Sequence, residues 1–401
     1  MSNLTDRSLL LCDVTQSWSA VGGGVGTYLR HKRRHILDHT PHRHLLIVPG
    51  ARDEVIEEDR TITATVASPK VPGSPNYRLL LRSGRVRRLL AEYQPDLIEC
   101  QDAYNLPWAA IGHARRFPSV ALVAAYMTDF PTVYVKRPFA KFVGQGLADA
   151  ASWLCYYYCG KLYRKFDILY ALSEHGGAAK LRALGLDPVE VVPLGAELGE
   201  FSPDRRDPAL RRELGVADEA PLLIYAGRID GEKRVQTVVD AFRLLPDALG
   251  AHLVLLGDGP LRSSLLERNL SRCHSPGFIY GRAALARWLA SADLYVSGMA
   301  DETFGISIIE AQAAGLPVVG VAAGAMLDRV DRSIGRLGPV GDSNAMAANI
   351  VELWSGDMAT MRTRVSEHAA GFSWDKSMES LFGRIYPEAL RRAAVRTGSS
   401  A

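Results

Sequence analysis

Short apolar runs alternate with longer helical patterns twice along this chain, and this alternation restricts its possible folds more than any other feature. In the first half, the runs expected to form buried strands lie at 9–14, 44–50, 96–100, 119–126, 167–173 and 189–195. The segments expected to form helices between them lie at 27–38, 76–93 and 107–116. Such alternation is typical of a parallel sheet covered by helices on both faces.

A second series follows a stretch rich in proline and charge, FSPDRRDPALRREL (201–214), which we interpret as a linker. Its expected strands lie at 221–227, 252–259, 277–281, 293–298 and 316–321, and its expected helices at 234–245, 260–268, 283–290 and 305–314. Two complete series predict an α/β protein with two doubly wound domains. Ligands bind at the carboxyl ends of strands in such sheets, so a shared site is expected in a cleft between two facing domains.

Length and composition agree with a globular enzyme of two or three domains. A chain of 401 residues is too long for one ordinary hydrophobic core. Its composition, with 47% hydrophobic and 23% charged residues, is average for such a protein. A formal net charge of +3 is too small a basic excess for a nucleic-acid binder. Five scattered cysteines without a CxxC indicate reduced thiols rather than a disulfide framework or a zinc site. Neither a signal peptide nor a spanning helix is expected, which predicts a cytoplasmic protein, in solution or peripheral on the cytoplasmic face of a membrane.

Two carboxylates flank a turn in the segment DETFGISIIEAQAAGLPVVG (301–320). Glu302 lies just before a predicted helix N-terminus, which favours a bound anion by about 0.3–1 kcal/mol, and Glu310 lies inside that helix. Because carboxylates accept hydrogen bonds from hydroxyl groups, this pattern fits a nucleotide sugar, in which polyol, phosphate and polyol follow one another. The alternative is that Glu302 caps the helix and Glu310 pairs with a surface arginine.

Two cations follow a predicted buried strand in YAGRIDGEKRVQTVVDAF (225–242). Arg228 can bind phosphate with two hydrogen bonds and Lys233 adds a point charge, so the pair could neutralise a diphosphate leaving group without a metal. The chain contains no Asp-x-Asp, which argues against a magnesium-dependent site. An isolated pair of this kind would be interpreted as two solvated cations, but this pair is predicted at the same strand ends as Glu302.

Glycines fill the predicted turn GGGVGTYLR (22–30), where they would let the backbone approach a ligand closely. The pattern is not GxGxxG followed by a ribose-binding acid, so a dinucleotide site is only weakly supported, and a tight turn without a ligand remains an alternative. A similar strand-end turn, GDGPLR (257–262), is expected to be structural.

Together these motifs resemble the retaining GT-B glycosyltransferases of family 4, also called glycosyl transferase group 1. The matching segments, in the family's order, are GGGVGTYL, PLGAELGEFSP, YAGRIDGEKR, GDGPLR, FIYG…ADLYVSG and ETFGISIIEAQAAGLPVVG. FSWDKSMESLFGRIY resembles the family's C-terminal crossover helix. The resemblance covers nearly the whole chain and is weaker in the first half. It implies an acceptor-binding Rossmann-like domain over 1–195, joined by crossover helix 374–395, and a donor-binding one over 196–373.

The resemblance also implies an activity and a set of roles. The expected reaction moves a hexose from a UDP- or GDP-sugar to a glycan or lipid-linked acceptor with retention, without a metal or other cofactor. Arg228 and Lys233 would stabilise the leaving diphosphate and, with Glu302 at the donor sugar, form the catalytic set, while Glu310 would hold the ribose. The residues expected to offer backbone to the donor are Gly23, Gly24, Thr303, Phe304, Gly305 and Ile306.

The chain departs from the family pattern at three places. Met127 stands where many relatives carry a polar residue, so Thr128 and Asp129 are expected to supply sugar or acceptor contacts instead. Arg234 replaces a commoner glycine and would add charge near the phosphates or point to solvent. Ser-Gly at 297–298 replaces the usual Pro-Ser.

Basic residues in the first half suggest an anionic membrane surface as a partner. Arg78, Arg82 and Arg85 would share one face of the helix predicted at 76–93, and segment 134–166 mixes aromatic residues with lysine and arginine. Each cation near such a surface is worth about 1 kcal/mol. The alternative is a solvated basic face beside a packed aromatic helix.

Two other activities also fit the motifs. The chain could be a GT-B phosphorylase or epimerase, or a catalytically silent subunit that binds a nucleotide sugar. Met127 favours the silent subunit, whereas the intact Arg228, Lys233, Glu302 and Glu310 oppose it.

Overall fold

The computed structural model describes residues 7–19, 23–71, 74–268 and 270–398 of the chain, which divide into two compact units. The first unit comprises Met1–Pro193 together with Ser377–Ala401, and the second comprises Leu194–Lys376. The sequence had suggested boundaries after 195 and 373. The second unit is thus inserted into the chain of the first.

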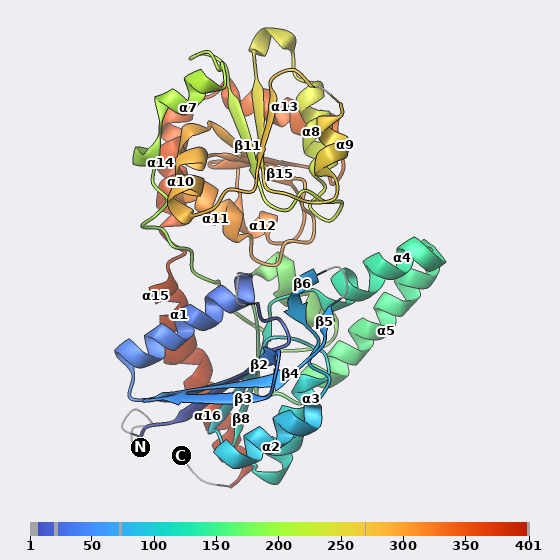
Figure 1. Cartoon of the computed structure of the whole chain (residues 1–401), viewed down its shortest axis with the longest axis vertical. Coiled ribbons are helices and arrows are strands. Elements are labelled where there is room, and N and C mark those ends of the chain that lie inside the picture. Colours follow the sequence, from blue (N-terminus) through green and yellow to red (C-terminus); the bar gives the residue numbers. More distant parts are fainter. Residues whose placement is uncertain (1–6, 20–22, 72–73, 269, 399–401) are drawn as a thin grey trace. The chain divides into compact units, whose positions relative to one another are not determined.

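An eight-stranded sheet forms the centre of the first unit, with the strand order β10-β9-β8-β7-β1-β2-β4-β3 (Figure 1). Its pairs are parallel except for β3, which runs antiparallel to β4 at the edge. The strands are β1 (Leu10–Val14), β2 (Arg43–Gly50), β3 (Glu54–Glu58), β4 (Thr61–Ala67), β7 (Leu97–Cys100), β8 (Ala121–Tyr126), β9 (Ile168–Ala171) and β10 (Glu190–Val191). The sequence predicts all of them except the edge hairpin of β3 and β4.

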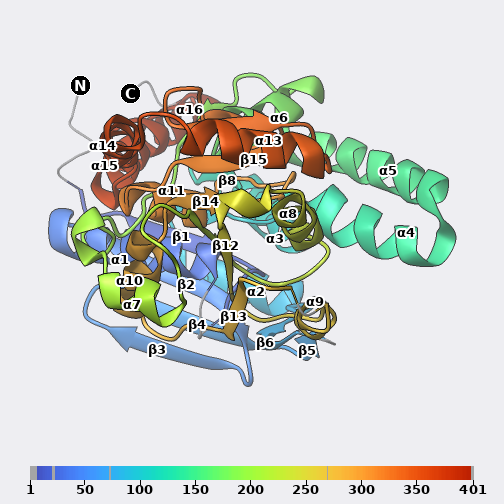
Figure 2. The same cartoon turned by 90° about the horizontal axis from the view of Figure 1, so that it is seen from above.

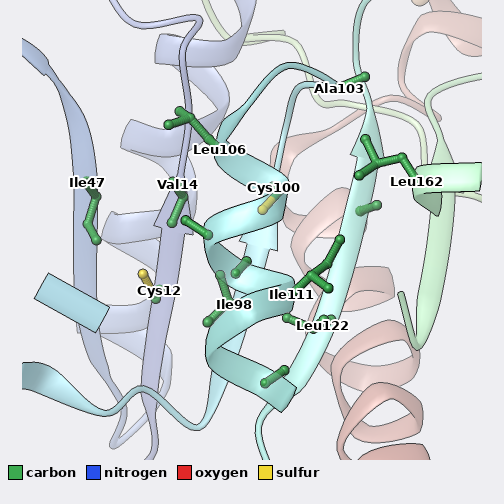
Figure 3. Close-up of a cluster of buried hydrophobic side chains, with 14 of the residues drawn as sticks. Cys12, Val14, Ile47, Ile98, Cys100, Ala103, Leu106, Ile111, Leu122 and Leu162 are labelled. Carbon is green, nitrogen blue, oxygen red and sulfur yellow. The ribbon is translucent and has the colours of Figure 1, made fainter. Parts of the chain in front are cut away.

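Apolar side chains from these strands and their helices form the core of the first unit. Figure 3 shows Cys12, Val14 and Ile98 from the strands beside Leu106 and Ile111 from a helix. The helices are α1 (Gly24–His39), α2 (Ser83–Tyr93), α3 (Leu106–Arg116), α4 (Arg137–Val143), α5 (Gln145–Tyr163), α6 (Ala179–Ala183) and α16 (Tyr386–Arg396). Burial on both faces explains why the central strands are mostly apolar rather than alternating, apart from a few buried charged residues.

The helix predicted at 76–93 is wrong over its first turns. Arg78 ends strand β6 (Ser74–Arg78), which pairs with β5 (Lys70–Val71), and the helix begins only at Ser83. Gln16 holds this segment extended, because its side-chain amide donates to the Arg78 carbonyl at 2.9 Å and its carbonyl oxygen accepts from Leu80 N at 3.1 Å.

The three arginines therefore do not share a helical face, and the helical arrangement predicted for them is wrong. Arg82 instead pairs with Asp53, with 2.7 Å between Nη1 and Oδ1, just before α2 begins.

A buried charged cluster joins α1 of the first unit to strands β1, β2 and β7 of its sheet. Lys32 Nζ lies 2.8 Å from Asp13 Oδ1 and 3.1 Å from Glu99 Oε2, and all three side chains are at most 1% exposed. His44 Nε2 lies 2.7 Å from the second oxygen of Asp13. Burial alone would raise the pKa of Asp13, but Lys32 and His44 hold it at about 2. The Tyr386 hydroxyl, from α16, donates to Glu99 at 2.7 Å.

A six-stranded, fully parallel sheet forms the second unit, in the order β13-β12-β11-β14-β15-β16. Its strands are β11 (Leu222–Ala226), β12 (His252–Leu256), β13 (Cys273–Gly277), β14 (Leu294–Val296), β15 (Val318–Val321) and β16 (Gly335–Gly338). Its helices, several of which are labelled in Figure 2, are α7 (Pro208–Glu213), α8 (Val235–Arg243), α9 (Arg262–Leu266), α10 (Arg282–Ser291), α11 (Ile306–Ala313), α12 (Met326–Arg329), α13 (Ser343–Trp354) and α14 (Met358–Ala369). Both units are Rossmann-like α/β domains, as the sequence predicted.

Two expectations for the second unit are wrong. The strand placed at 277–281 forms earlier, as β13, and leaves Phe278 and Tyr280 exposed beyond its end. The segment 201–214 is not a linker, because it folds onto the unit and contains α7. Arg206 and Arg211 lie 3.0 and 2.6 Å from the carboxylate oxygens of Asp293, just before β14. Its charged residues therefore serve tertiary ion pairs.

The C-terminal segment is helical, as expected for 374–395. It consists of α15 (Trp374–Ser380), a π-helical turn over Leu381–Ile385, and α16. Arg396 forms an ion pair with Asp167, next to β9 of the first unit. In the parts of the chain that the structure describes, we find no helix with both the length and the apolar character needed to cross a bilayer.

Candidate functional site

The loop between β14 and α11 carries Glu302 and has a conformation that requires glycine. Gly305 has a φ of 85°, and a Cβ there would lie 2.6 Å from Ile308 Cδ1 and 3.3 Å from Glu302 Cγ. The helix begins directly after this residue, so its first N–H groups lie beside the loop. The Glu302 carboxylate contacts a lysine instead of these groups, and Glu302 does not act as the helix cap.

That lysine is Lys233, whose Nζ lies 3.3 Å from Glu302 Oε2. The two side chains are 27% and 18% exposed, so both are reachable but partly desolvated. β11 and β14 are neighbours in the sheet, and the loops that follow them meet at the same edge. The strand order therefore brings together the cation and the carboxylate that the sequence analysis had placed at one site.

Arg228 is held by two carboxylates of its own loop. Its Nε lies 2.6 Å from Asp230 Oδ2 and its Nη2 lies 2.6 Å from Glu232 Oε2. The other oxygen of Asp230 accepts from the backbone N–H of Lys233 at 2.9 Å. Both acids belong to the motif YAGRIDGEKR, but no role for them was predicted from the sequence. Together they order the loop that presents both cations.

The neighbouring GDGPLR turn supports this loop through close backbone packing. A Cβ on Gly257 would lie 1.9 Å from the Gly227 carbonyl oxygen, and one on Gly259 would lie 2.3 Å from the Ile229 carbonyl oxygen. The Ile229 N–H also donates to the Asp258 carbonyl at 2.9 Å. The expected structural role of this turn is confirmed.

Arg234 ends the same loop in a left-handed conformation. Its φ is 50°, immediately before α8, and its side chain is exposed. Glycine adopts this conformation without strain, which gives a physical reason for the glycine that is commoner at this place. Of the two expectations for Arg234, exposure to solvent agrees with the structure.

Glu310 is buried and paired with an arginine. Arg282 Nη2 lies 2.9 Å from Glu310 Oε1, and Arg282 Nε lies 2.8 Å from Glu197 Oε2. Burial raises the pKa of Glu310, and Arg282 only partly opposes this. The alternative that paired Glu310 with an arginine therefore describes the contact found. Arg282 itself was missed, although it directly follows FIYG, where the resemblance had already placed a motif.

A second arginine that was not predicted from the sequence, Arg329, holds the Glu302 loop through Phe304. The buried guanidinium of Arg329 lies between the rings of Phe304 and Phe372, 4.6 Å from each centroid. Its Nε donates to the Phe304 carbonyl at 3.0 Å, and burial lowers the pKa of Arg329 to about 10. The Phe304 carbonyl is thus already bonded, and the Phe304 ring is part of the core. No motif in the sequence pointed to this contact.

Of the turn predicted at 22–30, Gly23 lies just before α1, whereas residues 24–30 already form the first turns of that helix. Gly23 has a φ of 106°, and a Cβ there would lie 2.8 Å from the hydroxyl of Tyr77. Gly24 is the first residue of the helix, whereas Gly22 lies outside the described residues. Gly23 is therefore needed for the turn itself, whether or not a ligand approaches it.

Thr128 and Asp129 follow β8, but their side chains differ in access. Thr128 is partly buried, whereas Asp129 is fully buried and its oxygens lie 2.7 Å from the Tyr156 hydroxyl and 2.8 Å from Lys180 Nζ. Burial would raise the pKa of Asp129, yet Lys180 keeps it below its ordinary value. Met127 is buried beside them. The role of Thr128 and Asp129 in binding a sugar or acceptor stays a prediction.

Asp102 lies beyond the end of β7 and was not singled out in the sequence. Its Oδ2 accepts from Thr15 Oγ1 at 2.9 Å and from Gln16 N at 2.6 Å, whereas its buried Oδ1 has no partner among the described residues. Burial raises the pKa of Asp102 to about 6. This carboxyl therefore titrates close to neutral pH at the carboxyl edge of the first sheet.

Comparison with known proteins gives matches along most of the chain. The family model described as "Glycosyltransferase Family 4" matches residues 22–200, and the one described as "Glycosyl transferases group 1" matches residues 220–356. The two matches fall in the first and the second unit, apart from a few residues at their junction.

Two relatives from Mycobacterium tuberculosis align over nearly the full length. A GDP-mannose-dependent alpha-(1-6)-phosphatidylinositol dimannoside mannosyltransferase is 28% identical over 357 residues, which is 86% of this chain and 87% of the relative. A GDP-mannose-dependent alpha-mannosyltransferase is 28% identical over 385 residues, 93% of each chain.

Solved structures share the fold at low sequence identity. Sucrose-phosphate synthase from Thermosynechococcus elongatus superposes with a TM-score of 0.73 at 20% identity and covers 95% of this chain and 99% of its own. HepE from Anabaena, in complex with UDP and glucose, gives a TM-score of 0.68 at 16% identity and covers 95% of this chain and all of its own.

Proposed function

Because this chain belongs to the group 1 glycosyltransferases of family 4 and has the GT-B fold, we propose that it transfers a mannose, with retention, from GDP-mannose to a hydroxyl of a lipid-linked acceptor. The coarser activity, glycosyl transfer from a nucleotide sugar, is shared by its relatives. The sequence left the donor open between UDP- and GDP-sugars. We choose GDP-mannose because both M. tuberculosis relatives are named as GDP-mannose-dependent. A lipid-linked acceptor follows from the phosphatidylinositol dimannoside in the name of one of them.

The observation that carries the proposal is the contact between Lys233 and Glu302 beside the start of α11. A cation, a carboxylate and the N–H groups of a helix N-terminus at one strand edge match a sugar followed by a phosphate. When the donor enters, Lys233 exchanges the carboxylate for a phosphate oxygen. Glu302 is then free to accept hydrogen bonds from sugar hydroxyls.

Charge neutralisation of the leaving group is the proposed source of catalysis. The bond between the anomeric carbon and the β-phosphate oxygen breaks, and its electron pair stays on the diphosphate. The acceptor oxygen bonds to the same face of the sugar, and its proton passes to the leaving phosphate. Lys233 and Arg228 stabilise the negative charge that develops, a form of electrostatic catalysis that often supplies the largest single contribution. The proposed reaction uses no metal.

Glu310 is proposed to hold the ribose. Arg282 donates to its Oε1, and Oε2 can accept a ribose hydroxyl while that ion pair persists. A buried carboxylate beside an arginine is a rigid acceptor, because both groups are held before the nucleotide binds.

Titration calorimetry with a panel of nucleotide sugars tests the donor. We expect GDP-mannose to bind most tightly, with GDP-glucose, UDP-glucose and UDP-N-acetylglucosamine weaker and with no effect of a chelator. Stronger binding of any UDP-sugar would contradict the proposed donor.

Product analysis by NMR tests the reaction. An α-mannoside formed from the α-linked donor is expected, and a β-mannoside would contradict retention. Phosphate-dependent release of a sugar phosphate would indicate a phosphorylase, and interconversion of the donor sugar would indicate an epimerase. Donor binding with neither hydrolysis nor transfer would indicate the silent subunit.

A further inference from the structure

An exposed apolar stripe runs along helix α5 of the first unit. Its residues lie at positions 147, 150, 153, 154 and 157, which fall on one face of a helix. Four of these side chains are large and exposed: Leu147 and Trp153 are each 67% exposed, Leu154 is 59% exposed and Tyr157 is 53% exposed. The opposite face carries the buried residues Ala148, Ser152 and Cys159, so α5 is already packed on its other side. The exposed face is the one that the unit does not use.

Helix α4, just before α5, also exposes large apolar side chains. Phe142 is 87% exposed and Phe139 is 50% exposed, three residues apart on α4 and just before the turn at Gly144. Figures 1 and 2 both show α4 and α5 side by side, running out from the sheet of the first unit. We call Phe139, Phe142 and Leu147 the hairpin tip. Monomeric soluble proteins rarely expose so many large apolar side chains together, and such patches mark interaction sites.

The segment that carries this apolar surface is basic in sequence. Residues 131–166 contain six Lys and Arg and one acid, Asp149, a net charge of +5 from six minus one. Asp149 is itself paired with Lys136, with 2.8 Å between Nζ and Oδ1. A surface that combines this charge with large apolar groups is complementary to an anionic lipid surface.

The order of side chains along α5 matches the layers of a membrane interface. Leu147 lies nearest the tip, and Trp153 and Tyr157, whose rings stack at 6.2 Å, follow. Lys161 comes next, with its Nζ 5.4 Å from the centre of the Tyr157 ring. Apolar groups suit the acyl boundary, Trp and Tyr suit the interface, and lysine reaches the headgroups.

We propose that the α4–α5 hairpin docks this protein on an anionic bilayer, with the hairpin tip inserted to the acyl boundary. The inference deepens the proposed function and rests on it in one respect, because a lipid-linked acceptor lies at such a surface. It replaces the predicted arginine face of 76–93, which the structure does not contain.

Vesicle sedimentation tests the docking, with vesicles of phosphatidylcholine alone and mixed with phosphatidylglycerol. We expect the full chain to bind the mixed vesicles, with weaker binding at higher salt. The double variant Phe142→Ser, Leu147→Ser should lower the partition coefficient roughly tenfold or more, because two large apolar groups leave the interface. The matched control is Ile56→Ser, which removes an apolar side chain 48% exposed on β3 and should change nothing.

Quenching by brominated lipid locates the inserted face. Fluorescence quenching in the mixed vesicles should fall in Trp153→Phe and persist in Trp108→Phe, which removes a tryptophan 41% exposed on α3. Equal vesicle binding by the tip variant and the parent would overturn the proposal. So would a concentration-dependent dimer that the tip variant disperses, without vesicle binding, since the face would then belong to a second copy of this chain.

Calorimetry of GDP-mannose in vesicle-free buffer separates this inference from the proposed function. The tip variant should bind GDP-mannose as the parent does. Vesicle binding by a chain that binds no nucleotide sugar would refute the proposed function and leave the docking surface supported.

Discussion

Lys233 and Glu302 contact each other, with 3.3 Å between Nζ and Oε2, although 69 residues separate them in the chain. Each neutralises the other before any donor binds, so the binding of a diphosphate sugar is an exchange of partners rather than the burial of a free charge. Such an exchange avoids leaving either charge unpaired and partly buried, which is costly in a region of reduced dielectric constant.

Replacing Lys233 with alanine is expected to abolish most turnover. Loss of one group that stabilises developing negative charge costs about 10²–10³ in kcat, whereas donor affinity should change less because Arg228 and the start of α11 remain. Steady-state kinetics with GDP-mannose and calorimetry measure the two quantities. The control is Arg243→Ala, which removes an exposed cation from the end of α8. Near-normal kcat in Lys233→Ala would refute the leaving-group role.

Arg329→Met is expected to loosen the Glu302 loop. The variant leaves the Phe304 carbonyl without the donor that Arg329 Nε provides at 3.0 Å, which costs about 1–3 kcal/mol of unfolding free energy. Donor affinity should fall as well, since the loop is less ordered. Urea unfolding and calorimetry test both effects, with Arg329→Lys as the variant that keeps the charge but loses the planar stacking. Unchanged donor affinity in Arg329→Met would show that the loop does not depend on this contact.

Arg234→Gly is expected to stabilise the fold by about 1 kcal/mol. The reason is the φ of 50° at this residue, which glycine adopts without the steric cost that other residues bear. Arg234→Ala keeps that cost and should give no such gain. Urea midpoints of the two variants decide the matter, and an equal shift in both would assign the effect to the lost charge.

Asp102→Asn is expected to remove a pH dependence of stability between about pH 4 and 6. The folded pKa of Asp102 is about 6, above its ordinary value of 3.8, so the native state retains a proton that the unfolded state has released in this window. The contribution of Asp102 to the unfolding free energy is largest below its ordinary pKa of 3.8. It falls by about 3 kcal/mol as pH rises to 6, and at higher pH it no longer changes.

The difference in unfolding free energy between the parent and Asp102→Asn should therefore move in favour of the variant as pH rises from 4 to 6. Asparagine keeps an oxygen that can accept from Gln16 N and Thr15. A difference independent of pH would show that Asp102 does not titrate in this range.

Lys32→Met is expected to destabilise the protein by about 3–5 kcal/mol. It would leave the carboxylates of Asp13 and Glu99 buried without the ammonium that lies 2.8 and 3.1 Å from them. The matched control on the same helix is Arg30→Met, which changes an exposed cation and should cost little. Comparable losses in the two variants would show that the buried cluster contributes no special stability.

The sheets were predictable because most of their strands are buried on both faces and are therefore largely apolar runs. Segments such as 9–14 and 252–259 can be identified as strands from their own residues, without knowledge of the residues that they contact. The wrong segments depend on distant residues instead. The Gln16 side chain forms hydrogen bonds with the backbone of Arg78 and Leu80, which are therefore not used in a helix. Asp293 forms an ion pair that holds the charged segment 201–214 on the second unit.

The proximity of Lys233 and Glu302 was predictable from strand order, because each follows a strand that ends at the same sheet edge. The partners of the other site residues were not. Arg282 meets Glu310 from another helix, and Arg329 reaches Phe304 from beyond the next strand. These contacts depend on how helices pack and leave no local pattern.

The insertion of the second unit within the chain of the first has a consequence for synthesis on the ribosome. Glu99 is made early, but the Tyr386 hydroxyl that donates to it is made only after the whole inserted unit. The first unit therefore cannot complete its fold until the second unit has been synthesised. A truncation near the C-terminus would damage the part of the molecule that was translated first.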